Sequence, residues 1–237
     1  MVQLATDPLA SPMWSYLAPQ LLGDAPVRFG PEVRVLMPSI AENQRVYPVT
    51  VDARAAGDVD RILIFSDLSP AQLALTYDVS AGEAYVGTRI KIDQRSPVRG
   101  AARLKSGGWI VGGAWIDAAG GGCSTPPVSR VRGDWSETMG QIRGKALRRL
   151  DGIRLRLNYR HPMDTGFVDN IAAFYIDTVT VKTPDGRLLA RLETMQSVSE
   201  DPAFTLQLRA GSEVQELVTE ARDTNGNVFA ARVPVES

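Results

Sequence analysis

The chain of 237 residues contains one cysteine, Cys123, and one histidine, His161. One cysteine cannot form an intramolecular disulfide, and two such residues are too few for a structural zinc site, which takes four Cys or His ligands. A catalytic site that requires two histidines is excluded by the same count. The glycine run before Cys123 is not followed by the Lys and Ser/Thr of a phosphate-binding loop. The sequence therefore predicts no metal site and no cofactor.

The chain also lacks an excess of charge and a long apolar run. Lys and Arg number 26 against 27 Asp and Glu, a formal net charge of -1, so nucleic acid is not an expected partner. No stretch approaches the roughly 20 apolar residues of a membrane span, and the sequence predicts a soluble protein. Residues 1–7 lack the basic and apolar regions of a secretory signal. They fit either a cytosolic protein or a mature exported chain, and the sequence leaves both open.

The first half of the chain shows the pattern of a short helix followed by β-strands. Ser11 and Pro12 are typical of a helix start, and Trp14, Leu17 and Leu21 recur at helical spacing, which predicts a helical segment in residues 1–30. Short apolar or alternating runs separated by Gly, Pro and Ser then predict a β-sandwich over residues 31–119. Its expected strands are 33–37, 46–53, 60–65, 73–77, 84–92, 97–104 and 109–117.

The second half predicts another sandwich, over residues 152–237. Its expected strands are 153–159, 172–182, 188–195, 204–208, 214–221 and 228–233. Between the two sandwiches, Asp134 and Glu137 have the spacing of a capping box, and an apolar stripe from Trp135 to Leu150 predicts a helix in the linker 120–151. The expected fold is therefore all-β, with two immunoglobulin-like β-sandwich domains joined by a linker that contains a helix.

Cys123 is the residue with the most distinctive neighbours. It follows Gly120, Gly121 and Gly122 and precedes Ser124-Thr125-Pro126-Pro127. A free cysteine is ordinarily a small buried core residue, but this glycine and proline setting favours a reactive thiol that is exposed on a flexible arm. An exposed unpaired thiol is also expected to form a disulfide-linked homodimer in air.

Several motifs resemble those of SoxY, the sulfur-carrying subunit of the bacterial thiosulfate-oxidising (Sox) system, and of its partner SoxZ. The first half resembles SoxY through Thr88-Arg89-Ile90-Lys91, Ser96-Pro97-Val98-Arg99 and the glycines before Cys123. The second half resembles SoxZ through His161-Pro162-Met163-Asp164-Thr165-Gly166, Ser199-Glu200-Asp201-Pro202-Ala203-Phe204 and Asp223-Thr224-Asn225-Gly226. The chain thus looks like a fused SoxYZ-like carrier of the type associated with quinoprotein dehydrogenases.

This resemblance implies a carrier rather than an enzyme. It implies that Cys123 holds sulfur intermediates covalently, that the protein is periplasmic, and that periplasmic sulfur-oxidising enzymes or cytochromes, or a quinoprotein dehydrogenase, are its partners. One departure is the position of the cysteine, which lies near the free C-terminus in SoxY. Here the chain continues through Pro126 and Pro127, so the arm is anchored at both ends and should reach less far.

Two other functions remain open from the sequence. The first is an accessory module that binds a periplasmic quinoprotein dehydrogenase and in which the thiol is incidental. The second is an enzyme that uses Cys123 as nucleophile and His161 as base. An ordinary role for His161, which precedes Pro162 at a strand end, is hydrogen-bonded support of its loop.

Overall fold

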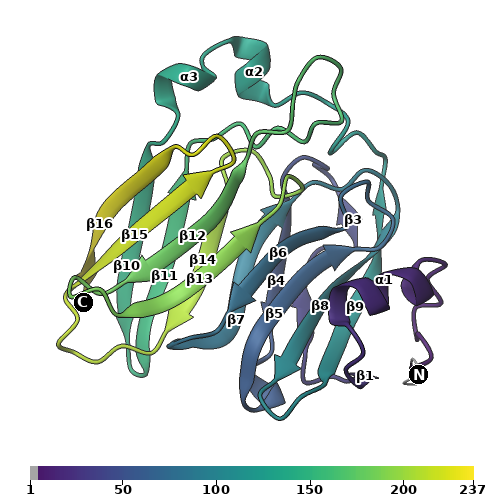
Figure 1. The fold of residues 1–237 in the computed structure, drawn as a ribbon, viewed down its shortest axis with the longest axis horizontal. Coiled ribbons are helices and arrows are strands. Elements are labelled where there is room, and N and C mark those ends of the chain that lie inside the picture. The colour runs from purple at the N-terminus through teal and green to yellow at the C-terminus, as the bar shows by residue number, and fades with distance from the viewer. Residues whose placement is uncertain (1–4) are drawn as a thin grey trace.

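The computed structural model describes residues 5–237 and is all-β, as predicted. Two layers of strands run the length of the molecule, with a helix on one flank and two short helices at one end (Figure 1). The first layer, sheet A, contains in spatial order β1 (Val27–Phe29), β9 (Trp109–Ala118), β8 (Ser96–Leu104), β5 (Val59–Ser66), β6 (Leu73–Asp78), β13 (Leu188–Thr194), β12 (Ile176–Lys182), β15 (Glu216–Asp223) and β16 (Val228–Glu236).

The second layer, sheet B, contains β2 (Arg34–Leu36), β4 (Tyr47–Asp52), β7 (Gly82–Ile90), β14 (Ala203–Leu208), β11 (Gly152–Tyr159) and β10 (Ile142–Arg149). A short parallel pairing of β10 with β16 joins the two sheets at one edge. The two-residue strand β3 (Ile40–Ala41) pairs with the end of β9.

Both sheets continue from the first half of the chain into the second. In sheet A, β6 pairs antiparallel with β13, and in sheet B, β7 pairs antiparallel with β14. Backbone hydrogen bonds therefore cross between the halves in both layers, and the two predicted sandwiches form one extended sandwich.

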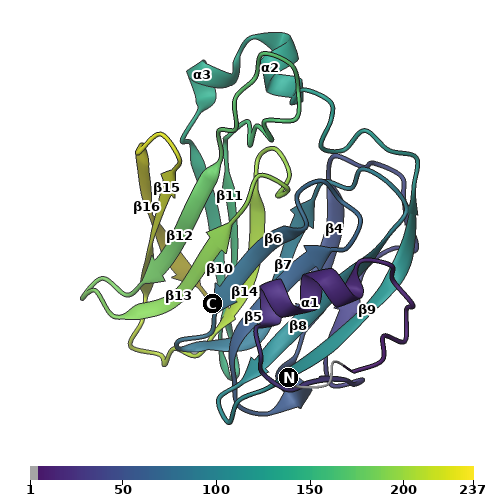
Figure 2. The ribbon, with the colours of Figure 1, turned by 45° about the vertical axis from the view of Figure 1, so that its right-hand side comes forward.

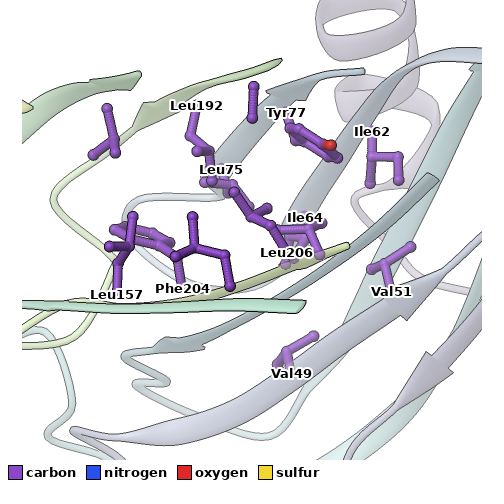
Figure 3. Packing of buried hydrophobic residues seen from close by; sticks show 14 of the residues in the cluster. Val49, Val51, Ile62, Ile64, Leu75, Tyr77, Leu157, Leu192, Phe204 and Leu206 are labelled. Carbon is purple, nitrogen blue, oxygen red and sulfur yellow. The ribbon is translucent and has the colours of Figure 1, made fainter. Parts of the chain in front are cut away.

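One hydrophobic core fills the space between the layers across both halves. It includes Val49, Val51, Ile62, Ile64, Leu75 and Tyr77 from the first half and Leu157, Leu192, Phe204 and Leu206 from the second (Figure 3). These side chains alternate along their strands with residues that face outward, as expected for strands with one face in the core.

The predicted N-terminal helix is present as α1 (Trp14–Leu22) and packs on the outer face of sheet A (Figure 2). Trp14, Ala18 and Leu22 contact a second apolar cluster that includes Phe65 and Val111. Pro19 lies inside this helix, which ends at Gly23 with a φ of 67°.

The predicted helix over 135–150 is wrong. Only α3 (Trp135–Thr138) is helical there, next to α2 (Val128–Arg132), and residues 142–149 form strand β10. Gly140, with a φ of +83°, breaks the helical path, and the following residues form an antiparallel hairpin with β11. Tertiary pairing overrides the helical spacing of the apolar residues, because β10 completes the edge of sheet B.

Candidate functional site

Cys123 lies in a loop, the cysteine segment (residues 119–127), that connects β9 to α2 at the end of the molecule where α2 and α3 lie (Figure 1). The expectation that its thiol is exposed is wrong in this structure, since Cys123 is 0% exposed. The next residue, Ser124, is exposed, so the buried cysteine adjoins an exposed position of the loop. Cys123 is not a member of either of the two hydrophobic clusters.

The glycines before Cys123 explain how the loop packs so tightly. Gly120 and Gly121 have φ values of +108° and +86°, which favour glycine. A Cβ on Gly122 would lie 2.3 Å from the carbonyl oxygen of Ile92 and 2.4 Å from that of Gln44. That the three glycines are flexible stays a prediction. In this closed arrangement Gly120 and Gly121 form turns with positive φ, and Gly122 allows two backbone carbonyl groups to approach closely.

Polar contacts fix the backbone of Cys123 on both sides. Its N–H donates to Asp93 Oδ1 at 2.9 Å, and the N–H of Ser124 donates to the same oxygen at 3.3 Å. On the other side, Thr165 Oγ1 donates to the carbonyl oxygen of Cys123 at 2.7 Å. Asp93 comes from the first half of the chain and Thr165 from the second, so both halves hold the cysteine segment.

The thiol itself has few polar neighbours. Its Sγ lies 4.0 Å from the carbonyl oxygen of Lys91. Burial raises the pKa of Cys123 to about 11, and the nearby Lys91 ammonium offsets only part of this effect. Because the thiolate is the nucleophile, a raised pKa slows the reactions of the thiol at neutral pH while the segment stays closed.

Lys91 lies directly under the cysteine segment and links the two halves. Its ammonium donates to the carbonyl oxygens of Met163, Gln196 and Val198 at 2.6, 2.9 and 2.8 Å. These three acceptors match the three protons of an ammonium group. Burial lowers the pKa of Lys91 to about 8, while Cys123 raises it, so the side chain is mainly protonated at neutral pH.

The second half of the chain also holds α2, which follows the cysteine segment. The Glu200 carboxylate accepts the N–H groups of Val128 and Ser129, at 2.7 Å each. Arg130 forms an ion pair with the fully buried carboxylate of Asp164 and stacks on the ring of Trp135, with 3.7 Å from the guanidinium carbon to the ring centroid. Charged groups therefore hold the start of α2, where the chain leaves the cysteine segment.

His161 is near this region but does not pair with the thiol. Its Nδ1 accepts the N–H of Met163 at 3.0 Å, its Nε2 lies 3.5 Å from Asp223 Oδ2, and its ring contacts Phe174 at a centroid distance of 4.5 Å. Burial lowers the pKa of His161, so the ring is neutral. The imidazole supports the loop that contains Asp164 and Thr165, which agrees with the ordinary role expected from the sequence.

Within residues 5–237, no three His, Cys, Asp or Glu side chains are grouped as metal ligands. None of the helices in this part of the chain has the length and apolar content needed to cross a bilayer.

Comparison with protein families places both halves of the chain. Residues 18–123 match the family model of sulfur oxidation protein SoxY, and residues 142–234 match that of sulphur oxidation protein SoxZ. The chain is a fused SoxYZ-like protein. The SoxY match ends at Cys123 itself, and the SoxZ match begins at the first residue of β10.

Solved structures give weaker similarities, and no curated protein matches the chain. The sulfur carrier protein SoxY from Chlorobium limicola f thiosulfatophilum is 17% identical and covers 45% of this chain and 96% of its own, with a TM-score of 0.39. A glycosyl hydrolase family 2 member from Bacteroides cellulosilyticus is 14% identical and covers 80% of this chain but 24% of its own, with a TM-score of 0.23. The assignment as a SoxYZ-like protein therefore depends on the family matches.

Sequence reasoning did not assign roles to the groups that hold the cysteine segment. Lys91, Thr165 and Glu200 each belong to a motif that carries the SoxYZ resemblance, but these motifs are far apart in the sequence. The structure brings all three against the segment or its exit into α2. Their presence in these motifs was the one indication in the sequence that they have a role. What they contact becomes clear only when the two halves are paired in the structure.

Proposed function

We propose that this SoxYZ-like protein carries sulfur covalently on Cys123 and that the cysteine segment opens to load and unload it. The observation that carries the proposal is the position of Cys123. It is the last residue of the SoxY match, and it lies in a loop held by hydrogen bonds, outside the two hydrophobic clusters. A loop held in this way can open at a much smaller free-energy cost than a core residue needs for exposure.

The chemistry that a single thiol supports here is transfer of a sulfane sulfur. In the open state the Cys123 thiolate attacks the outer sulfur of a donor persulfide, RSSH. One S–S bond forms and one breaks, the donor leaves as RSH, and the protein keeps the persulfide Cys–SSH after one proton is exchanged. The reverse reaction with an acceptor thiol unloads the carrier, and neither direction needs an external oxidant.

Closure gives the carrier a protective state. A buried thiol with a raised pKa resists oxidation and unwanted disulfide exchange, including the homodimer expected for an exposed thiol. We propose periplasmic sulfur-oxidising enzymes or cytochromes as the partners that engage the open segment. The anchoring of the segment at both ends favours partners with an open active site, and a quinoprotein dehydrogenase is a further proposed partner.

The burial of Cys123 also supports a second candidate function. If the segment does not open, the protein is an accessory module and its thiol is incidental. The two candidates differ in whether native Cys123 can be loaded with sulfur.

The test is intact mass spectrometry after incubation of the reduced native protein with glutathione persulfide. The carrier proposal expects a mass gain of one sulfur atom that is absent in Cys123→Ser and is removed by dithiothreitol. A Thr165→Val variant should gain sulfur faster than the unmodified chain. No gain on native protein, with a ready gain on the same protein unfolded in urea, would reject the carrier and favour the accessory module.

A further inference from the structure

Positively charged side chains are concentrated on the outer face of the β10–β11 hairpin. Residues 142–159 contain six of the 26 basic residues of the chain and one of its 27 acidic residues, Asp151. Five of the six face outward or lie at the surface, and we call this group the basic face: Arg143, Lys145, Arg149, Arg154 and Arg156.

The strand register explains why these side chains share one face. Leu155 and Leu157 on β11 and Ala146 on β10 are buried, so the residues that alternate with them point away from the core. Lys145 lies directly opposite Arg156 in the antiparallel pairing. Two like charges at opposite positions destabilise a sheet, so local stability does not account for this arrangement.

The basic face is also poor in counter-charges. Across residues 5–237, Lys145 is the one member with a carboxylate within 4.0 Å, that of Glu236 at 3.5 Å. The neighbouring strand β14 places Thr205 and Gln207 beside Arg156 and Arg154, and these side chains are uncharged.

Sheet A provides an internal comparison. Five arginines on its strands each have a carboxylate partner on the same or the adjacent strand, with N···O distances of 2.5–3.3 Å: Arg61–Asp78, Arg103–Asp60, Arg191–Glu193, Arg222–Asp177 and Arg232–Glu216. These arginines of sheet A are thus paired, and on sheet B Arg34 pairs with Asp52, whereas the four arginines of the basic face have no carboxylate of residues 5–237 within 4.0 Å. Because the net charge of the whole chain is -1, the basic face is a local excess of positive charge and not a property of the overall composition.

We propose that the basic face is a docking surface for a protein partner with an acidic surface. Complementary charge steers the encounter of two proteins and orients the complex, with modest affinity, which suits transient contacts. An acidic protein fits better than nucleic acid, because β10, β11 and β14 present no outward aromatic ring on which bases could stack. It also fits better than a membrane, because one large apolar side chain, Leu150 at the hairpin tip, is highly exposed beside this face.

The basic face reaches the end of the molecule that contains Cys123. Arg143 lies near the start of β10, which follows α3, and its partner Asn158 lies near the end of β11, just before the loop of His161 and Thr165 (Figure 1). A partner docked on this face would therefore lie toward the end of the molecule where Thr165 contacts Cys123. The docking proposal does not itself require that Cys123 carries sulfur.

The test uses the full chain with Cys123→Ser, so that thiol chemistry cannot contribute. The probe is a fluorescently labelled poly-L-glutamate peptide of about 20 residues, with binding measured by anisotropy at low and physiological ionic strength. The variant is Arg154→Glu with Arg156→Glu. Its matched control is Lys105→Glu with Arg187→Glu, two exposed positions outside the basic face that change the net charge equally. Thermal unfolding checks that each variant folds.

We expect the peptide to bind, with an affinity that falls as salt is added. The variant on the basic face should lower the affinity at least tenfold, and the control less than threefold. Equal losses in both variants would mean that only net charge matters and would overturn the proposal. So would tighter binding of an oligonucleotide of equal charge, or of phosphatidylglycerol vesicles, than of the peptide.

Discussion

Thr165 Oγ1 donates a 2.7 Å hydrogen bond to the carbonyl oxygen of Cys123, across the junction between the SoxZ-like and SoxY-like halves. Thr165 is itself buried, and its hydroxyl oxygen also accepts the N–H of Phe167 at 3.2 Å. The backbone of the residue that carries the thiol is thus held by the opposite half of the chain. In a fused protein this contact cannot be lost by dissociation, so exposure of the thiol requires local opening of the cysteine segment.

The first prediction is that Thr165→Val increases the exposure of Cys123. Valine keeps the shape of threonine but removes the hydrogen bond, which contributes about 0.5–1.5 kcal/mol. The closed state should lose that free energy, and the rate of Cys123 alkylation by iodoacetamide at pH 8 should rise about fivefold, the factor that corresponds to about 1 kcal/mol. The rate is measured by intact mass under native conditions.

Thr178→Val is the matched control, because Thr178 lies on β12, outside the contacts of the cysteine segment. Its alkylation rate should equal that of the unmodified protein. An unchanged rate in Thr165→Val, with normal folding, would show that this hydrogen bond does not limit opening.

The second prediction concerns the exit of the segment. Glu200→Ala removes a carboxylate that accepts two backbone N–H groups at the start of α2. Hydrogen bonds to charged groups contribute about 1.5–3 kcal/mol, so alkylation of Cys123 should accelerate at least tenfold. Hydrogen exchange should show lower protection confined to residues near 119–132. The control is Glu220→Ala, an exposed position on β15; equal acceleration in this control would contradict a specific role for Glu200.

The third prediction concerns pH. Burial raises the pKa of Cys123 from its ordinary value of 9.0 to about 11, so the closed state binds the thiol proton more tightly than the open state does. The contribution of the Cys123 proton to the stability of the closed state is fully present below pH 9 and is lost as the pH rises toward about 11. The alkylation rate of native protein should therefore keep rising about tenfold per pH unit between pH 9 and 10.

Protein unfolded in urea is the reference for this experiment. Its thiol should titrate near pH 9.0, so its alkylation rate should level off over the same interval. Native and unfolded proteins with the same pH profile would contradict the raised pKa and would indicate that the segment is mostly open.

The sequence predicted much of the fold because the strands alternate clearly and the turns contain Gly, Pro or Asn. It failed over residues 135–150, where helical spacing of Trp135, Met139 and Ile142 competes with a strand whose partner, β11, lies immediately after it. Spacing alone cannot resolve that competition, since the gain comes from pairing and from closure of sheet B.

The site was predicted less completely than the fold. Cys123 and its glycines were identified, but glycines before a thiol are compatible both with a flexible arm and with close packing under a neighbouring backbone. Close packing depends on the carbonyl oxygens of Ile92 and Gln44, which approach Gly122 only once the chain has folded. Asp93 and Thr165, which hold Cys123 in its buried position, lie 30 and 42 residues away from it in the sequence. The sequence alone therefore did not indicate these contacts.

The last prediction is that Lys91→Met uncouples the two halves. The ammonium of Lys91 satisfies three carbonyl oxygens of the SoxZ-like half, and methionine preserves the length of the side chain but leaves these acceptors buried without donors. Each unsatisfied group costs about 1–3 kcal/mol, partly offset because no charge is buried any longer, so the free energy of unfolding should fall by about 2–5 kcal/mol.

The control is Lys105→Met, at an exposed position, which should change the free energy of unfolding by less than about 0.5 kcal/mol. Because β6–β13 and β7–β14 still connect the two halves, the Lys91→Met variant should fold, but the urea transition should broaden as the halves lose cooperativity, and Cys123 should be alkylated faster. A sharp transition at an unchanged urea midpoint would show that strand pairing alone couples the halves and that Lys91 does not contribute.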